Sequence, residues 1–240
     1  MKKYVLILIL FIFSSSNLCY GASEGWSLGG LLGTITVKQD DLNLLNGRSN
    51  TRDSGISTSQ LSNAWEIGGF ISYRFASSFV AFQLRPTYMF QSEEGSSATG
   101  NNYKYSASSF TIFPMFKFYL LEDTMLKFFT QVGVGYGFMS GEIEEAGRSV
   151  DFSGGDLGFK VGLGAELCFT DTHCVFMEGN YRLLRTNRTI AKSVTGDFST
   201  LTGPASLSQA TKDQEVEVDG RDLGLSMTGV QGFLGYEFHF

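Results

Sequence analysis

The 240-residue chain is poor in features that mark most soluble proteins and most helical membrane proteins. Only 18% of its residues are charged, against about 25% in ordinary soluble domains. After residue 20, no stretch approaches the ~20 consecutive apolar residues of a transmembrane helix. These shortages exclude a bundle of transmembrane helices, and the net charge of −6 argues against a nucleic-acid partner.

Motifs for catalysis and metal binding are scarce as well. The chain has 2 histidines: His173 lies in a predicted turn and His239 is next to last. Neither lies near a serine and an acid in an arrangement typical of a catalytic triad, and no cluster has metal-ligand spacing. We therefore expect a protein that is not an enzyme and that holds no cofactor and no metal.

What the chain has instead is alternation of apolar and polar residues with a period of two. In the last eleven residues the polar face is formed mainly by Gln231, Glu237 and His239. The opposite face is apolar and aromatic, and consists of Val230, Gly232, Leu234, Tyr236, Phe238 and Phe240. An exposed aromatic strand at a sheet edge invites aggregation in water, whereas a closed barrel in lipid needs such a face and has no edge.

Eight stretches show this strand-like pattern. They are residues 26–38, 64–76, 79–90, 110–120, 126–138, 157–169, 175–183 and 230–240. The first is rich in glycine and alternates poorly. Most are long enough to cross a bilayer as tilted strands, which takes about 9–11 residues.

The segments between these stretches alternate in length. The long polar ones are residues 40–63, 92–104, 142–154 and 187–222; the short ones are 77–78, 121–124 and 170–173. This layout predicts an all-β fold, an eight-stranded antiparallel up-and-down transmembrane β-barrel with four long extracellular loops and short periplasmic turns. The last long segment is expected to be an exposed extension of its hairpin or a disordered loop.

The strand pairing in two hairpins follows from the turns. A two-residue turn at 77–78 places Tyr73 opposite Phe82. For the next hairpin we expect Phe118 opposite Leu126, which puts Lys117 opposite Lys127. Pro86 and Pro114 lie within strands, where proline removes a ladder hydrogen bond, so we expect the two prolines to share a bulge.

The chain end also resembles a known signal. A terminal Phe240, with Phe238, Tyr236 and Leu234 at every second position before it, resembles the C-terminal assembly signal of bacterial outer-membrane β-barrels. With the strand layout, the chain resembles the small outer-membrane barrel family of the OmpA, OmpX and OmpW type. The resemblance implies the outer membrane of a Gram-negative bacterium, contact with its lipid and lipopolysaccharide, and assembly by the barrel-assembly machinery.

The beginning of the chain fits export. Lys2 and Lys3 precede an apolar run over residues 4–13, and small residues stand near position 21. We expect a cleaved signal peptide at residues 1–21 and a barrel domain at 22–240. Cleavage as a lipoprotein before Cys19 is the alternative. Removal of the two lysines changes the net charge from −6 to −8.

The barrel lumen is expected to contain a polar network. Its charged members are Glu66, Arg74, Arg85, Lys117, Lys127, Lys160, Glu166, Glu178, Arg182 and Glu237. Because the two facing lysines would repel each other, a carboxylate from Glu166 or Glu178 should lie near them. The network is either a salt-bridged plug or part of a narrow water or ion path. The path is suggested by inward glycines at positions 133, 135, 137, 158, 162 and 164, which leave space on neighbouring strands. The alternative is that Arg85 or Arg182 fills this space.

Two cysteines flank the last short turn. Symmetric pairing about Asp171 places Cys168 opposite Cys174, and the periplasm is oxidising. A disulfide is therefore expected, with two free thiols as the alternative.

Three functions remain open. The leading hypothesis is a non-catalytic surface protein that displays its loops for adhesion or interaction with an unknown extracellular partner. The alternative is a narrow pore for water, ions or small solutes. The third is a lipid-modifying enzyme, which would need a His–Ser pair near the lipid face that the sequence does not show.

Overall fold

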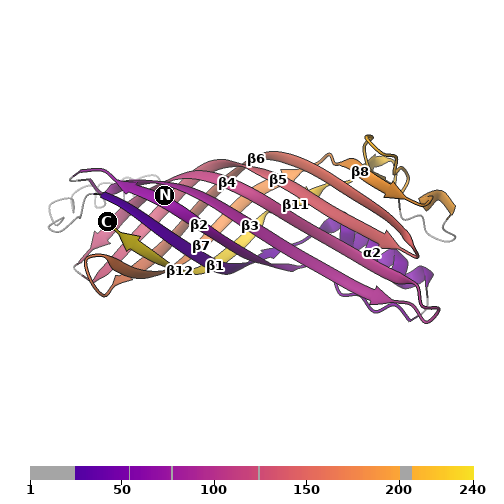
Figure 1. Cartoon of the computed structure of the whole chain (residues 1–240), viewed down its shortest axis with the longest axis horizontal. Helices are drawn as coiled ribbons and strands as arrows, with labels where there is room; N and C mark the ends of the chain where they lie inside the picture. Colours follow the sequence, from indigo (N-terminus) through magenta and orange to yellow (C-terminus); the bar gives the residue numbers. More distant parts are fainter. Residues whose placement is uncertain (1–24, 54, 77, 124, 201–206) are drawn as a thin grey trace, which may run out of the picture.

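The computed structural model describes residues 25–240 apart from 54, 77, 124 and 201–206. Eight antiparallel strands close into a barrel, in the order β1-β2-β3-β4-β5-β6-β7-β12, with β12 paired back to β1 (Figure 1). The strands are β1 (Gly25–Val37), β2 (Asn63–Arg74), β3 (Val80–Ser96), β4 (Asn102–Glu122), β5 (Leu126–Glu145), β6 (Arg148–Cys168), β7 (His173–Thr186) and β12 (Gly229–His239). The predicted eight-stranded barrel is confirmed.

The period-two alternation explains how the barrel is built. Along β7, buried and exposed residues alternate without a break from His173 to Thr186. The exposed set is mostly apolar and the buried set mostly polar, as closure in lipid demands. Both ends of the described chain lie at the end of the barrel that carries the short turns (Figure 1), where the Phe240 N–H donates to the Trp26 carbonyl at 3.0 Å. The expected signal peptide lies outside the described residues.

No helix among the described residues is long and apolar enough to cross a membrane.

Four strands are much longer than expected. β3 and β4 continue as a hairpin to Ser96 and Asn102, and β5 and β6 continue to Glu145 and Arg148. The predicted loops at 92–104 and 142–154 were therefore wrong, since most of these residues extend the sheet. Figure 1 shows the extensions running past the other four strands toward the end opposite the termini.

The faces of these strands invert along their length. On β4 the outward residues change from Phe116, Ile112 and Phe110 to Ser108 and then Ser106 and Lys104, while the inward residues change from Lys117 and Thr111 to Tyr105 and Tyr103. The alternation is unbroken, but the apolar side moves from outside to inside. A prediction that follows only the apolar outer face therefore ends these strands before their true ends.

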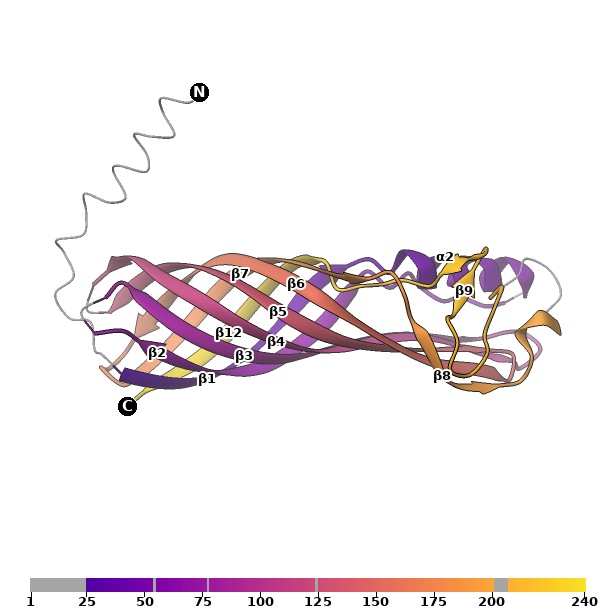
Figure 2. The same cartoon turned by 90° about the horizontal axis from the view of Figure 1, so that it is seen from above.

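The extensions form a lobe with the segments beside them, which we call the distal lobe. It comprises the outer ends of β3–β6 and the described residues of the segments 39–62 and 187–227. The long segments contribute helix α2 (Asp40–Arg52), β8 (Ile190–Thr195), the turn η1 (Phe198–Thr200), β9 (Glu217–Val218), β10 (Arg221–Asp222) and β11 (Leu225–Ser226). Figure 2 shows α2 and β9 along one side of the distal end and β8, which pairs with β6, along the other. The loop over 40–63 thus contains an unpredicted helix, and 187–222 is largely folded back on the sheet.

The distal lobe has a hydrophobic core of its own. Leu42 and Leu45 of α2 are fully buried against side chains from the sheet and from the last long segment. The strand contribution includes Met89, Tyr103, Tyr105, Met139, Ile143, Val150 and Phe152, and the last segment adds Phe198, Leu207, Val216, Val218, Leu223 and Leu225. The lobe is therefore packed like a soluble domain.

Two pairing predictions need correction. Tyr73 does pair with Phe82, but Phe118 pairs with Thr130, because β4 continues to Glu122 opposite Lys127 and the turn comes later than expected; a bulge at Tyr119–Leu121 changes the β4–β5 register by one residue. The expected shared bulge at Pro86 and Pro114 is absent, since β3 and β4 keep one register through both prolines. Each proline instead interrupts pairing on its other side, where its missing N–H breaks the ladder toward β2 or β5.

Candidate functional site

The first ion pair of the lumen joins β2 to β7 near the distal lobe. Arg182 Nη1 donates to Glu66 Oε1 at 2.9 Å, and both side chains are fully buried. Glu66 also accepts from Thr87 at 2.5 Å and from Gln231 at 2.6 Å. With three partners, the buried carboxylate has its hydrogen-bonding capacity largely met.

A second buried pair joins β3 to β7. Arg85 of β3 forms a two-pronged salt bridge with Glu178 of β7. Gln131 and Asn180 donate to the same carboxylate at 3.0 and 2.9 Å. Residues far apart in sequence are thus tied across the barrel, so this network braces the lumen as well as filling it.

The third cluster lies at the turn end. Arg74 donates two hydrogen bonds of 2.6 Å to the Glu122 carboxylate, and Lys127 Nζ is 3.6 Å from the same carboxylate. Glu122 comes from the end of β4, and sequence reasoning did not select it. The β4–β5 bulge is what brings it opposite Lys127.

The cross-strand partner of Lys117 differs from the predicted one. It pairs with Gln131 across the sheet, not with Lys127. Its Nζ contacts Glu166 and lies 3.4 Å from Glu237 Oε2. Glu166 was one of the two carboxylates expected beside it, but Glu178, the other, is held by Arg85.

Lys160 stands apart from these pairs. Its Nζ is buried and has no hydrogen-bond partner among the described residues. The Phe113 ring centroid lies 4.9 Å from it and that of Phe233 5.8 Å. Ring faces attract a cation and partly replace the water it has lost.

The inward glycines do not leave an open path. A Cβ added to Gly133 would meet Met115, one on Gly135 would meet the Phe113 ring, and one on Gly164 would meet the Phe129 ring, all within 2.7 Å. Gly137, Gly158 and Gly162 face Leu184 and Asn180 in the same way. The space beside these glycines is thus filled by neighbouring side chains, and not by Arg85 or Arg182.

The structure joins Cys168 and Cys174 in a disulfide. The two residues are directly opposite each other in the β6–β7 hairpin, six positions apart in sequence. The bond closes the last turn at the same end of the barrel as Glu166 and Glu237.

The terminal strand presents its aromatic residues outward. Leu234, Tyr236, Phe238 and Phe240 are all exposed, and Tyr236 hydrogen-bonds His173 on β7. The Phe238 ring lies 5.2 Å from His173 and 6.1 Å from Phe240, measured between centroids. These contacts form part of an aromatic band near the turns.

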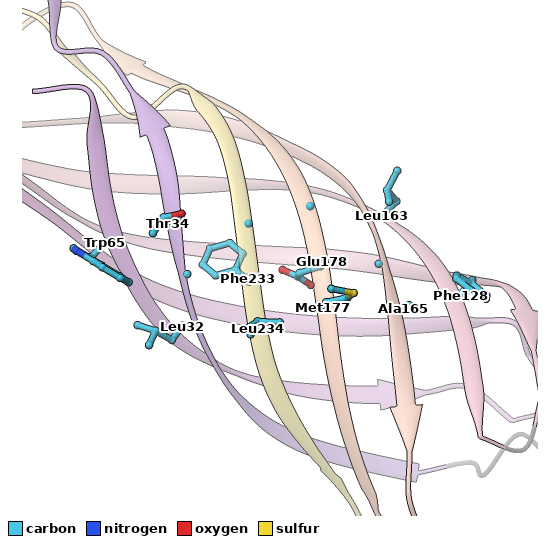
Figure 3. Close-up of a pocket in the computed structure, with 14 residues that line it drawn as sticks. Leu32, Thr34, Trp65, Phe128, Leu163, Ala165, Met177, Glu178, Phe233 and Leu234 are labelled. Atoms are coloured by element: carbon cyan, nitrogen blue, oxygen red, sulfur yellow. The ribbon is translucent and has the colours of Figure 1, made fainter.

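A groove of about 740 Å³ crosses the outer wall (Figure 3). Its rim includes Trp65, Leu163 and Met177, and its lining includes outward Gly179 and Gly232. A Cβ on Gly232 would meet nothing within 4 Å. The groove lies on the apolar outer face, so it belongs to the lipid-contacting wall and not to a passage through the lumen.

Charged groups fasten α2 to the distal lobe. Arg52 donates to Glu145 at 2.7 Å, and the buried Tyr105 hydroxyl donates to the same residue at 2.7 Å. Tyr103 donates to Asp53, and burial together with that carboxylate raises the pKa of Tyr103 to about 12. The tyrosines therefore stay neutral donors at physiological pH.

The last long segment is tied to the start of α2. Arg221 donates to Asp41 at 2.5 Å, and the Gly224 N–H donates to Asp41 at 2.8 Å. Sequence reasoning missed this lobe. The inward Tyr103, Tyr105, Ile143 and Val150 signal it, because they alternate with polar residues in the opposite phase from the barrel.

Comparison with protein families identifies the class. The model of the outer membrane protein beta-barrel domain family matches residues 5–202, so the chain belongs to this family. The protein is thus an outer-membrane β-barrel protein of a Gram-negative bacterium. A search of curated proteins found no match.

Solved structures show the same fold at low sequence identity. OprG from Pseudomonas aeruginosa is 12% identical with a TM-score of 0.50, over 91% of this chain and 96% of OprG. NspA, a Neisserial surface protein, is 12% identical over 92% and 100%, with a TM-score of 0.41. The protease OmpT from Escherichia coli is 10% identical over 94% and 100%, with a TM-score of 0.42. At these identities OprG supports the fold alone, and the other two carry no argument about this chain.

Proposed function

We propose that this protein is a non-catalytic surface protein in which the barrel anchors the distal lobe outside the cell. The observation that carries the proposal is the pairing of a lumen filled by buried ion pairs with a lobe that has its own packed core. The barrel then serves as a rigid support, and the lobe is the surface available to a partner.

The contacts inside the lumen favour a closed interior filled by ion pairs over a continuous water or ion path. Arg85, Arg182, Glu66 and Glu178 are all buried and bonded to one another or to neighbouring amides. Opening a path would separate these charges, and breaking a buried pair costs about 3–5 kcal/mol. The glycines that suggested a channel are packed against large side chains.

The outer face of the distal lobe supports interaction. A groove of about 260 Å³ on this face is lined mainly by hydroxyl and charged groups, among them Ser106, Ser108, Ser140, Glu142, Asp151 and Lys192. It lies on β4–β6 directly beyond the aromatic residues Phe110 and Phe138. Such a lining suits a polar partner that forms hydrogen bonds.

Two measurements test the proposal. The mature protein is refolded, checked by the different migration of unboiled and boiled samples, and placed in a planar bilayer; we expect a silent barrel. Cells displaying the protein are then compared with cells displaying Ser108→Tyr/Ser140→Tyr on arrays of immobilised sugars and proteins. We expect the filled groove to lower binding at least tenfold.

A lumen variant serves as control for the binding assay. Gln83 is a fully buried lumen residue that accepts a hydrogen bond from Arg85 at 2.8 Å, so Gln83→Ala changes the lumen and should leave surface binding as in the wild type. Steady single-channel openings that change with Arg85→Ala would contradict the proposal and favour the narrow pore. Equal surface binding by the groove variant and the wild type would remove the groove as the interaction site.

A further inference from the structure

Three groups that bind metals meet at the turn end of the lumen. One carboxylate oxygen of Glu166, one of Glu237 and a ring nitrogen of His239 lie within 4.8 Å of one another. His239 Nε2 is 3.9 Å from Glu237 Oε1. Glu237 and His239 are two apart on β12 and so share its inward face, while Glu166 reaches the same point from β6.

Two polar atoms of these residues have no hydrogen-bond partner in the part of the chain that the structure describes. Glu166 Oε2 and His239 Nε2 are buried and make no hydrogen bond among the described residues. Glu166 itself is fully buried. Buried polar atoms are nearly always satisfied, so orphaned atoms in two of three converging groups indicate a missing partner that is a cation or a donor.

One ammonium group contacts both carboxylates of the site. Lys117 is the ammonium group that contacts both Glu166 and Glu237, which leaves two carboxylates with one positive charge. Lys127 faces Glu166 across β5–β6, but its Nζ is 3.6 Å from Glu122, which it shares with Arg74. The two carboxylates thus share one contacting ammonium group, while Arg74 and Lys127 together face the single carboxylate of Glu122.

The donor set selects the kind of ion. An imidazole nitrogen suits zinc and its first-row neighbours, whereas Ca²⁺ and Mg²⁺ prefer oxygen alone. Ligand atoms on a tetrahedral Zn²⁺ lie about 3.3–3.5 Å apart, given bonds of about 2.0–2.2 Å. The three ligand atoms therefore need to approach one another by about 1.5 Å at most.

The geometry points to a Zn²⁺ site formed by Glu166, Glu237 and His239 at the periplasmic mouth of the lumen. The fourth position is left for water. Since β7 lies between β6 and β12, the ion bridges two strands that do not pair with each other, beside the β12–β1 seam where the barrel closes. His239 is part-exposed, so the ion reaches the site from the periplasm.

Zinc titration of refolded protein tests the site. The mature chain is prepared without a histidine tag, stripped with chelator, and kept unreduced so that Cys168 and Cys174 offer no thiolate. Titration calorimetry with ZnCl₂ should give one ion per barrel, and substitution by Co²⁺ should give the visible absorption of a tetrahedral site. His239→Asn should weaken zinc binding at least tenfold.

The second histidine is the matched control. His173→Asn removes an exposed imidazole at the same end of the barrel and should bind zinc as the wild type does. Glu237→Gln is a second variant, used if His239→Asn fails to refold, and should show the same loss. Equal binding by His239→Asn and His173→Asn, or no wild-type binding below millimolar zinc, would overturn the proposal.

Discussion

Four strands, β3–β6, run from the barrel into the distal lobe, and their polarity in the two regions is opposite. Within the membrane, β3–β6 point Phe116, Phe128 and Val134 outward and Lys117, Gln131 and Lys160 inward. In the lobe the outward residues are serines and charges, and the inward ones form the apolar core. No turn separates the membrane-spanning part of each strand from its part in the lobe, so each of the four strands passes directly from lipid into water.

The difference shows that the solvent outside sets which face is apolar. In lipid, apolar side chains cost nothing on the outer wall, and the polar groups must be enclosed and paired. In water, burial of apolar surface is the main driving force, about 25 cal/mol per Å². The barrel is therefore held by its ladder and buried ion pairs, and the lobe by hydrophobic packing.

The largest expected effect comes from breaking a lumen ion pair. Arg182→Met leaves Glu66 without its cation and should lower the free energy of unfolding by about 3–5 kcal/mol. Adding Glu66→Gln should restore part of the loss, because no charge then stays unpaired. Urea unfolding from lipid vesicles, followed by fluorescence of Trp26 and Trp65, measures both; additive losses in the double variant would contradict the pairing.

The next effect should stay within the distal lobe. Leu45→Ala removes a fully buried side chain of α2, and such a change costs about 2–5 kcal/mol. Because the lobe has its own core, proteolysis of the lobe should accelerate while Trp26 and Trp65, both in the barrel, report unchanged barrel unfolding. Parallel loss of both regions would show that lobe and barrel unfold as one unit.

A matched pair on β5 tests the change of solvent directly. Val134 and Ser140 both point outward, and Val134 is 57% exposed on the lipid face. Val134→Arg should cost about 2–4 kcal/mol if it lies near the bilayer midplane. Ser140→Arg should cost next to nothing, since it faces water. Equal costs in the two variants, measured by refolding into vesicles, would place the membrane boundary elsewhere.

The smallest effect is expected at the disulfide. Cys168 and Cys174 close a short loop, for which chain entropy gives about 2 kcal/mol at most. Cys168→Ser/Cys174→Ser should lower barrel stability by that amount and leave the lobe unchanged. Thiol labelling of unreduced mature protein should find no free cysteine; two reactive thiols would show that the bond is not formed.

Sequence reasoning was strongest where one rule held throughout. Because a lipid-facing strand must alternate, Tyr73 could be placed opposite Phe82 and all eight strands could be located. It failed at Lys117 because β4 continues to Glu122, which pairs with Lys127, so the turn comes later in the chain than the prediction assumed; the bulge at Tyr119–Leu121 changes the register by only one residue.

The site was harder to derive for a related reason. Which inward residues are charged follows from alternation, but which charge meets which depends on the tilt and stagger of the strands. Arg85 meets Glu178 across the barrel, and 93 positions separate them in sequence. The lobe was missed because its inverted alternation resembles a polar loop when only the outer face is inspected.

Amide hydrogen exchange of the refolded protein in bilayer discs tests the central claim most directly. If the distal lobe is folded on a sealed barrel, amides in residues 102–107 and 142–152 should exchange as slowly as those of β4 and β5 within the membrane. Exchange of these segments at the rate of an unstructured loop, with the barrel still protected, would contradict the account.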